Sequence, residues 1–336
     1  MVYRAIGVAL LALSAWSLWW TVRFARADWL FVRGSIRQAA QLSPENAEYA
    51  GALAQAEPDR AVEILRAAAE RNPLDGGLRI ELGLAEEERG NFANAESSLL
   101  HATRLDHGFG PRAALADFYL HRNDAGKFWP VMKDALSVSY GDDWDQFRQC
   151  WSLSEDAQII LERAIPDRQH VLRFYLDFLL NEGRLDAATP VARRVLVRAD
   201  KDSALSLLNY CDRMLEKSRV EEAKLVWDGL SDRKLIVESG RGFDWRIASG
   251  PGFRVVRTAD GWTIEFSGRQ AESIELLTRY VALDPDRSYV LHCPVPEQSG
   301  LKCELTLGRL SLVYRRLPGT TRLEGTVHVG EIGVVQ

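Results

Sequence analysis

The sequence has few of the residues and motifs on which common catalytic and metal sites depend. It holds four cysteines and six histidines in 336 residues, with no C-x-x-C pair and no histidines at ligand spacing. It also has no G-x-S-x-G, H-E-x-x-H or G-x-x-x-x-G-K-[ST] motif. We therefore predict no catalytic residue, no cofactor-binding residue and no metal ligand, and we expect a protein that is not an enzyme.

An excess of positive charge is absent as well. The chain has 42 basic and 47 acidic residues, a net charge of -5. Nucleic-acid binding depends on a positive field that holds the phosphate backbone, so nucleic acid is not expected as a partner. Residues 236–336 carry 12 basic and 12 acidic side chains, so the negative charge belongs to the part before them.

Long apolar runs are rare, and the one exception is at the N-terminus. From Ala5 to Val22 the chain has 18 uncharged residues, which as a helix would span about 27 Å, close to a hydrocarbon core. Trp16, Trp19 and Trp20 cluster at one end of this run, as interfacial indoles do. The pattern predicts a transmembrane helix within an anchor of residues 1–27.

Two other interpretations of this segment stay open, and so does its orientation. Cleavage after Ala25-Arg26-Ala27 would make it a signal peptide, and burial in a soluble domain would make it a core helix. Orientation depends on basic residues: Arg4 precedes the run, and four arginines follow it closely, at positions 23, 26, 33 and 37. The positive-inside rule taken alone would place the body of the protein in the cytoplasm.

Residues 28–235 contain a repeated pattern of small and apolar residues. The landmarks Leu82-Gly83, Gly90 and Ala102 recur 33 residues later as Leu115-Ala116, Asn123 and Ala135. A later pair of units repeats at 35 residues, with Gly183 matched by Ser218. These units resemble the tetratricopeptide repeat, a helix pair of about 34 residues whose copies stack into a solenoid with a groove. The stretch 138–166 is irregular in this pattern.

Polar residues of the second unit are candidates for contacts in the repeat groove, although a solvated helix face is the alternative. They are Arg112, His121, Arg122, Asn123 and Lys127.

After residue 235 the periodicity changes to short alternating segments separated by Gly, Pro, Asp and Ser. Six segments in about 100 residues predict an antiparallel β-sandwich over 236–336, so the fold class is multidomain, α then β. Cys293 and Cys303 lie on two of these segments, and a disulfide across a hairpin is geometrically allowed. The aromatic candidates for stacking on a sugar, for which core packing is the alternative, are Trp245, Trp262, Tyr280 and Tyr314.

The segments 243–247, 262–268 and 280–291 resemble strands of the jelly roll found in carbohydrate-binding modules and galactose-binding-like domains. The order of anchor, repeats and jelly roll resembles a group of bacterial envelope proteins linked with O-antigen or exopolysaccharide export. This resemblance implies a non-enzymatic scaffold at the inner membrane that binds protein partners of the cell envelope through its repeats. It also implies a body outside the cytoplasm, against the arginine count.

Two alternatives remain for the β-sandwich. It would be a glycan-binding module if an exposed aromatic stacks on a pyranose ring and polar side chains bind its hydroxyl groups. It would belong to a carbohydrate-active enzyme if two carboxylates converge in a cleft.

Overall fold

The computed structural model describes residues 2–236, 240–284 and 286–335, and the side chains at positions 2–5, 8 and 9 lie outside this description. The chain divides into two compact units, Met1–Pro166 and Asp167–Gln336. The last two helix pairs thus belong with the β-strands, whereas the sequence grouped them with the earlier repeats. Each unit is described by itself.

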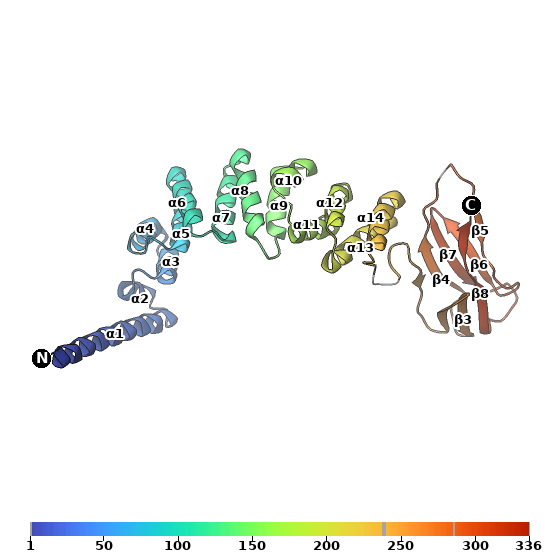
Figure 1. Cartoon of the computed structure of the whole chain (residues 1–336), viewed down its shortest axis with the longest axis horizontal. Helices are drawn as coiled ribbons and strands as arrows, with labels where there is room; N and C mark the ends of the chain where they lie inside the picture. Colours follow the sequence, from blue (N-terminus) through green and yellow to red (C-terminus); the bar gives the residue numbers. More distant parts are fainter. Residues whose placement is uncertain (1, 237–239, 285, 336) are drawn as a thin grey trace. The chain divides into compact units, whose positions relative to one another are not determined.

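The first unit is helical (Figure 1). Its elements are α1 (Val2–Val32), α2 (Ile36–Leu42), α3 (Ala47–Ala56), the 3-10 turn η1 (Pro58–Arg60), α4 (Ala61–Arg71), α5 (Gly76–Glu88), α6 (Phe92–Leu105), α7 (Phe109–His121), α8 (Ala125–Val138), α9 (Trp144–Leu153) and α10 (Ala157–Arg163). The irregular stretch is therefore helical too, because α9 and α10 occupy it as two short helices.

Helix α1 is longer than the predicted anchor. One face of its C-terminal part is buried, with Ala27 0% and Leu30 9% exposed against α2 and α3, and the helix continues past residue 27. In the part of the chain that the structure describes, no helix combines the length and the apolar character needed to cross a membrane. Ala5, Val8 and Ala9 of the predicted span have side chains outside that part.

Close approach of paired helices explains the repeat landmarks. A Cβ placed on Gly83 of α5 would lie 2.7 Å from Leu99 Cγ of α6, so the glycine allows these two helices to pack. Asp75 begins α5, because its side chain accepts a hydrogen bond from Leu78 N.

The turns between paired helices share one backbone conformation. Gly90, Asn123, Gly183 and Ser218 have φ of 76°, 53°, 69° and 59°, and each follows the first helix of its pair. This left-handed region is open to glycine and, among other residues, is favoured most by asparagine. The described helices thus follow one another as a helical repeat of paired helices, as the spacing predicts.

The second unit joins four helices to three antiparallel sheets. The helices are α11 (Gln169–Asn181), α12 (Leu185–Val197), α13 (Lys201–Glu216) and α14 (Val220–Asp232). The strands are β1 (Arg246–Ile247), β2 (Phe253–Thr258), β3 (Gly261–Ser267), β4 (Ser273–Tyr280), β5 (Val290–His292), β6 (Leu301–Thr306), β7 (Arg309–Arg315), β8 (Glu324–Gly330) and β9 (Gly333–Val335).

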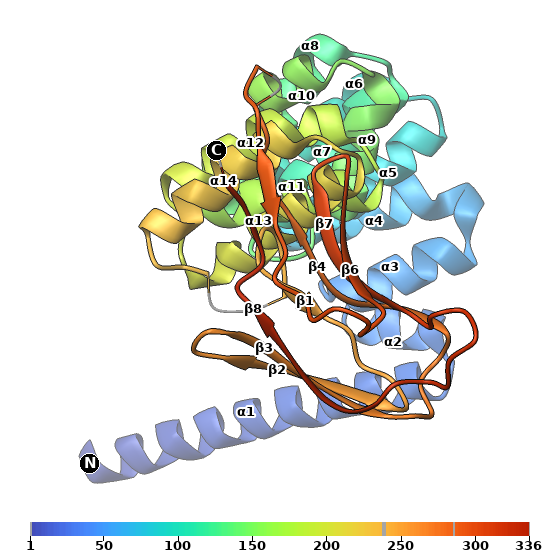
Figure 2. The same cartoon turned by 90° about the vertical axis from the view of Figure 1, so that its right-hand side faces the viewer.

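The described strands form sheets in the orders β1-β4-β7-β6, β2-β3-β8 and β5-β9. Figure 2 shows β4, β7 and β6 running side by side. The sheets share one core, in which Trp262, Ile264 and Phe266 point inward from alternate positions of β3 and Phe266 meets Tyr314 of β7 at 5.0 Å between ring centroids. Six strands match the segments predicted from alternation, β1 lies within the segment 243–247 that resembles a jelly-roll strand, and β4 and β9 were not predicted as strands.

The disulfide between Cys293 and Cys303 is present, with Cα atoms 6.0 Å apart. It does not cross a hairpin, because β5 pairs with β9 and β6 pairs with β7. The bridge instead connects two sheets.

Candidate functional site

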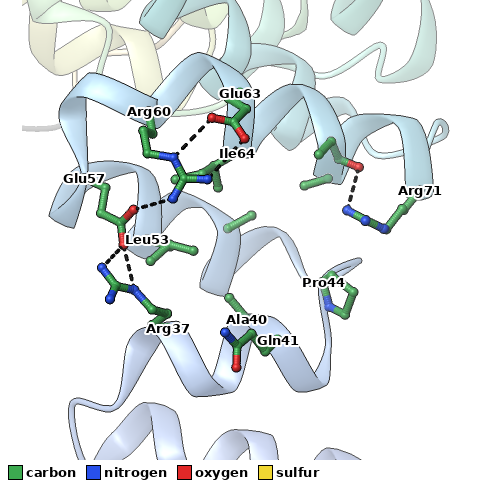
Figure 3. Close-up of a pocket in the computed structure, with 13 residues that line it drawn as sticks. Arg37, Ala40, Gln41, Pro44, Leu53, Glu57, Arg60, Glu63, Ile64 and Arg71 are labelled. Carbon is green, nitrogen blue, oxygen red and sulfur yellow. Dashed lines mark hydrogen bonds and ion pairs between the residues drawn. The ribbon is translucent and has the colours of Figure 1, made fainter.

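A groove of about 400 Å³ lies on the first unit among α2, α3 and α4 (Figure 3). Its floor is apolar and built from alanine, leucine and isoleucine side chains on three helices. The floor residues are Ala40, Ala50, Leu53, Ile64 and Ala68. We call this feature the α2–α4 groove.

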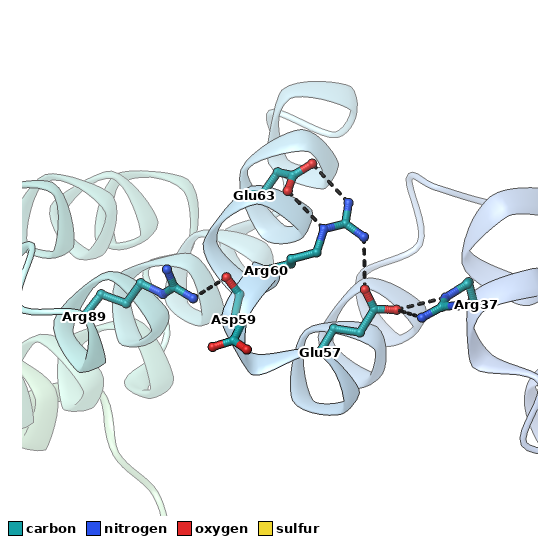
Figure 4. A network of polar contacts seen from close by, with 6 residues as sticks. All are labelled: Arg37, Glu57, Asp59, Arg60, Glu63 and Arg89. Carbon is teal, nitrogen blue, oxygen red and sulfur yellow. Dashed lines mark hydrogen bonds and ion pairs between the residues drawn. The ribbon is translucent and has the colours of Figure 1, made fainter.

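Paired charges border one end of the α2–α4 groove (Figure 4). Arg37 Nε donates to Glu57 Oε1 at 2.9 Å, and Arg60 Nη1 donates to Glu57 Oε2 at 3.0 Å. Arg60 also holds Glu63 through two hydrogen bonds of 3.1 Å. Arg89 of the α5 C-terminus donates to the Pro58 carbonyl at 3.0 Å and to that of Asp59, which fixes the η1 turn beside the network.

The hydrogen bond from Arg37 holds the pKa of Glu57 below its ordinary value of 4.5, and the hydrogen bonds from Arg60 lower that of Glu63 in the same way. Both carboxylates are therefore ionised at neutral pH. The network is lost only as the pH falls through these lowered values. Its charges neutralise one another, so this end of the groove offers little net attraction to a charged ligand.

Arg71 lies at the opposite end of the groove, near Pro44 (Figure 3). Its Nη1 donates to the carbonyl of Ala67 in its own helix at 3.2 Å. Among the described residues it has no carboxylate partner. The α2–α4 groove thus combines an apolar floor with one unpaired, exposed cation, which suits a segment that carries apolar side chains and a carboxylate.

The lining holds no serine, cysteine or histidine that could act as a nucleophile or base. Across the described residues, no three His, Cys, Asp or Glu side chains come together as a metal site.

The predicted groove contacts lie elsewhere, at the two ends of α7. His121, Arg122, Asn123 and Lys127 gather at the α7–α8 turn, whereas Arg112 sits in the first turn of α7 and donates to the Gly108 carbonyl at 2.8 Å. His121 Nδ1 is 3.0 Å from Glu87, Lys127 Nζ donates to Glu96 at 2.6 Å, and Asn123 occupies the left-handed turn position. The side chains of His121 and Lys127 thus connect neighbouring helices.

Three of the four candidate sugar-stacking aromatics are core residues. Trp245, Trp262 and Tyr314 are 5%, 2% and 1% exposed, so no ring face is left for a ligand. Tyr280 is partly exposed and lines a second cavity. A polar cavity of about 810 Å³ among the loops of the sheets contains one carboxylate, Glu324, where a glycosidase needs two.

Sequence reasoning missed the α2–α4 groove. Its residues come from three helices, and no local motif connects them.

No protein-family model matches the chain, and no curated protein matches it. Solved structures similar to it include YrrB, described as a tetratricopeptide-repeat protein with an unusual peptide-binding site, at 15% identity and TM-score 0.29, over 60% of this chain and 93% of that one. Residues 41 to the end of MamA from Desulfovibrio magneticus RS-1 match at 12% identity and TM-score 0.26, over 56% and 94%. The Cut9–Hcn1 complex matches at 13% identity and TM-score 0.33, over 64% and 45%. The repeat in this chain is shown by its own helix pairs and by the turns that join them.

Proposed function

We propose that this protein is a docking scaffold without enzymatic activity and that the α2–α4 groove binds a short segment of a partner protein. The main support for the proposal is that the groove combines an apolar floor with one cation, Arg71, that has no described carboxylate partner. A segment with apolar side chains would cover Leu53 and Ile64, and a carboxylate at its end would meet Arg71. The network at the other end, in which Arg37 and Arg60 are neutralised by Glu57 and Glu63, would exclude a further charge.

Selection of displayed peptides on the immobilised full-length protein tests this function. We expect the selected peptides to share apolar residues and a carboxylate. Arg71→Ala should weaken their binding about tenfold, the value of one charge-assisted contact, when affinity is measured by fluorescence anisotropy. Arg104 is an exposed arginine on α6, and Arg104→Ala is the matched control. This substitution should leave the affinity for the peptides unchanged. Peptides that bind Arg71→Ala as tightly as the wild type would overturn the proposal.

We further propose that α1 anchors this scaffold in a membrane. The support is exposure of its apolar side chains: Leu11, Leu13 and Leu18 are 73%, 64% and 64% exposed. Trp16 and Trp19 are 62% and 55% exposed near the C-terminal end of the apolar run, where Arg23 lies over the Trp20 ring at 4.6 Å. Exposed leucines and tryptophans on a helix are suited to contact with lipid.

We place the body of the scaffold outside the cytoplasm. The support is the disulfide between Cys293 and Cys303, since such bonds persist in oxidising compartments. The arginines that follow the run argue the other way, although Arg37 is engaged by Glu57 and Arg23 by the Leu42 carbonyl. On the resemblance to envelope proteins, we extend the proposal to polysaccharide assembly or export and expect the docked partner to be a component of that machinery.

A fusion of alkaline phosphatase after Gln336 tests the anchor and the orientation together. In bacterial cells we expect an active enzyme in the membrane fraction, because the phosphatase folds only outside the cytoplasm. Deletion of residues 2–22 should leave the fusion inactive and in the soluble fraction. An inactive full-length fusion would contradict the orientation, and an unchanged distribution after the deletion would contradict the anchor.

A further inference from the structure

Beyond its apolar run, α1 has one face that the other helices of the first unit leave uncovered. Successive residues of a helix are rotated by about 100°, so Arg26, Trp29 and Arg33 lie on the same side, and Val32 borders them. Arg33 follows the last residue of α1, but its N donates to the Trp29 carbonyl at 3.3 Å, so the helical turn continues to it. All four residues are exposed. We call them the Arg26–Arg33 face.

The Arg26–Arg33 face carries two positive charges. Among the described residues, no carboxylate is paired with Arg26 or Arg33, whereas the arginines at positions 23 and 37 each have a carboxylate within 4.0 Å. Asp28 is the one acidic residue of α1, and its position in the sequence places it on the opposite side of the helix. There its carboxylate accepts a hydrogen bond from the Tyr49 hydroxyl. The face is therefore suited to an anion.

Trp29 holds one of the two cations in place. The Arg33 guanidinium lies 4.0 Å from the centroid of the Trp29 ring, a cation–π contact. A guanidinium is planar and has N–H groups along its edge, so stacking on a ring leaves these groups free to donate. Phosphate oxygens accept two such hydrogen bonds at once, which makes phosphate a preferred ligand for this group.

The face lies just beyond the apolar run that we propose to be in the membrane. Arg26 is four residues past Val22, about 6 Å along the helix axis, and Trp29 is about 10 Å past it. Helical side chains lean toward the N-terminus, so the side chains of this face point back toward the run. The headgroup layers make up the difference between about 30 Å of hydrocarbon and about 40–45 Å of whole bilayer, so the face lies close to their level.

Apolar surface on the same face favours a lipid over a protein as its partner. Trp29 and Val32 are 52% and 85% exposed. This exposure is unfavourable in water, whereas an indole is favoured in the headgroup layer. Basic and apolar side chains together on one helix face are typical of helices that contact a lipid interface. An acidic protein segment would pair with the arginines, but it would have to enter the headgroup layer to reach them.

We propose that the Arg26–Arg33 face binds the headgroup of an anionic phospholipid. The inference rests on the proposed anchor and adds the class of lipid that surrounds it. The phosphate accepts hydrogen bonds from the two guanidiniums, and Trp29 lies at the boundary between the headgroup and the acyl chains. In a zwitterionic phospholipid an ammonium group already neutralises the phosphate, so the two arginines distinguish the two classes of lipid.

Native mass spectrometry of the full-length protein in a neutral detergent tests the proposal, with dioleoylphosphatidylglycerol as the anionic lipid and dioleoylphosphatidylcholine as the zwitterionic one. One arginine at an anionic lipid surface contributes about fivefold in affinity, so we expect phosphatidylglycerol to bind about 25-fold more tightly than phosphatidylcholine. Arg26→Gln combined with Arg33→Gln should remove this preference and leave the affinity for phosphatidylcholine unchanged. Both side chains are exposed, so the double variant should fold as the wild type does.

Arg104→Gln is the matched control, since Arg104 is an exposed arginine on α6, and it should keep the full preference for phosphatidylglycerol. Equal affinity of the wild type for the two lipids, or an unchanged preference in the double variant, would overturn the headgroup site and leave the anchor standing. An acidic segment of a partner protein would then be the better candidate for this face. Binding of neither lipid would overturn the anchor as well. Arg71→Ala should bind both lipids as the wild type does, so the outcome is independent of the docking function.

Discussion

Replacement of Gly300 by alanine is expected to raise hydrogen-exchange rates in β6 and β7 about a thousandfold, which corresponds to about 4 kcal/mol. Gly300 has φ +72°, and a Cβ there would overlap the carbonyl oxygen of Arg315, which is backbone and cannot turn away. The two residues are also joined by a hydrogen bond, Arg315 N to Gly300 O, of 2.8 Å. The strand pair would therefore have to separate at this point.

Gly319→Ala is the control for the effect of the backbone angle alone. Gly319 has nearly the same conformation, φ +77°, with nothing within 4 Å of an added Cβ. Alanine at this position should lower the free energy of unfolding by only about 1 kcal/mol, which is the penalty for a side chain in the left-handed region. Equal effects of the two substitutions would show that the close approach of Gly300 to Arg315 does not limit stability.

Asp212→Ala should destabilise the connection between α13 and the sheets by about 3 kcal/mol. The Asp212 carboxylate accepts hydrogen bonds from Arg241 Nε at 2.9 Å, Arg246 Nη2 at 2.8 Å and Gly242 N at 2.7 Å. Its side chain is 21% exposed, so removal leaves charged donors partly buried and without this acceptor. Hydrogen exchange at residues 240–247 measures the effect, and these amides should lose protection before those of β7.

Asp186→Ala is the matched carboxylate. It pairs with Arg219 at 2.7 Å, but its side chain is 96% exposed, so the expected change stays within about 0.5 kcal/mol. A loss of protection at residues 240–247 no larger than that of Asp186→Ala would mean that α13 and the sheets are held together by other contacts.

The repeats could be predicted because their signal is local. Each helix pair needs a left-handed turn and a small residue at the seam, and these needs repeat at a fixed spacing. Asn123 shows the limit of this reasoning: its polarity suggested a groove contact, whereas the turn requires the left-handed conformation that asparagine tolerates.

Strand β4 shows why part of the β region was missed. Its register shifts between Glu275 and Leu277, and Leu276 and Leu277 are both fully buried. A bulge interrupts the two-residue alternation of apolar and polar side chains by which a strand is recognised in a sequence. Strand β9 has three residues, too few to show any period.

The α2–α4 groove was missed for a different reason. Arg71 is one of several arginines without a described carboxylate partner, and its position at the end of the groove is what distinguishes it. Pairing depends on which helices and strands meet, and one sequence does not contain that information. The same holds for Cys293, whose bridge to Cys303 was allowed by spacing although the strands that flank it pair with other partners.

The continuity of α1 has a consequence for how partners find the groove. The helix runs without a break from its exposed apolar part to Ala27 and Leu30, which pack against the helices that form the groove. If the proposed anchor holds residues 5–22 in a membrane, the ten residues from 23 to 32 extend only about 15 Å beyond it. The groove would then lie close to the lipid headgroups. A partner confined to the same membrane would meet it at a high effective concentration, and modest affinity would then suffice for stable docking.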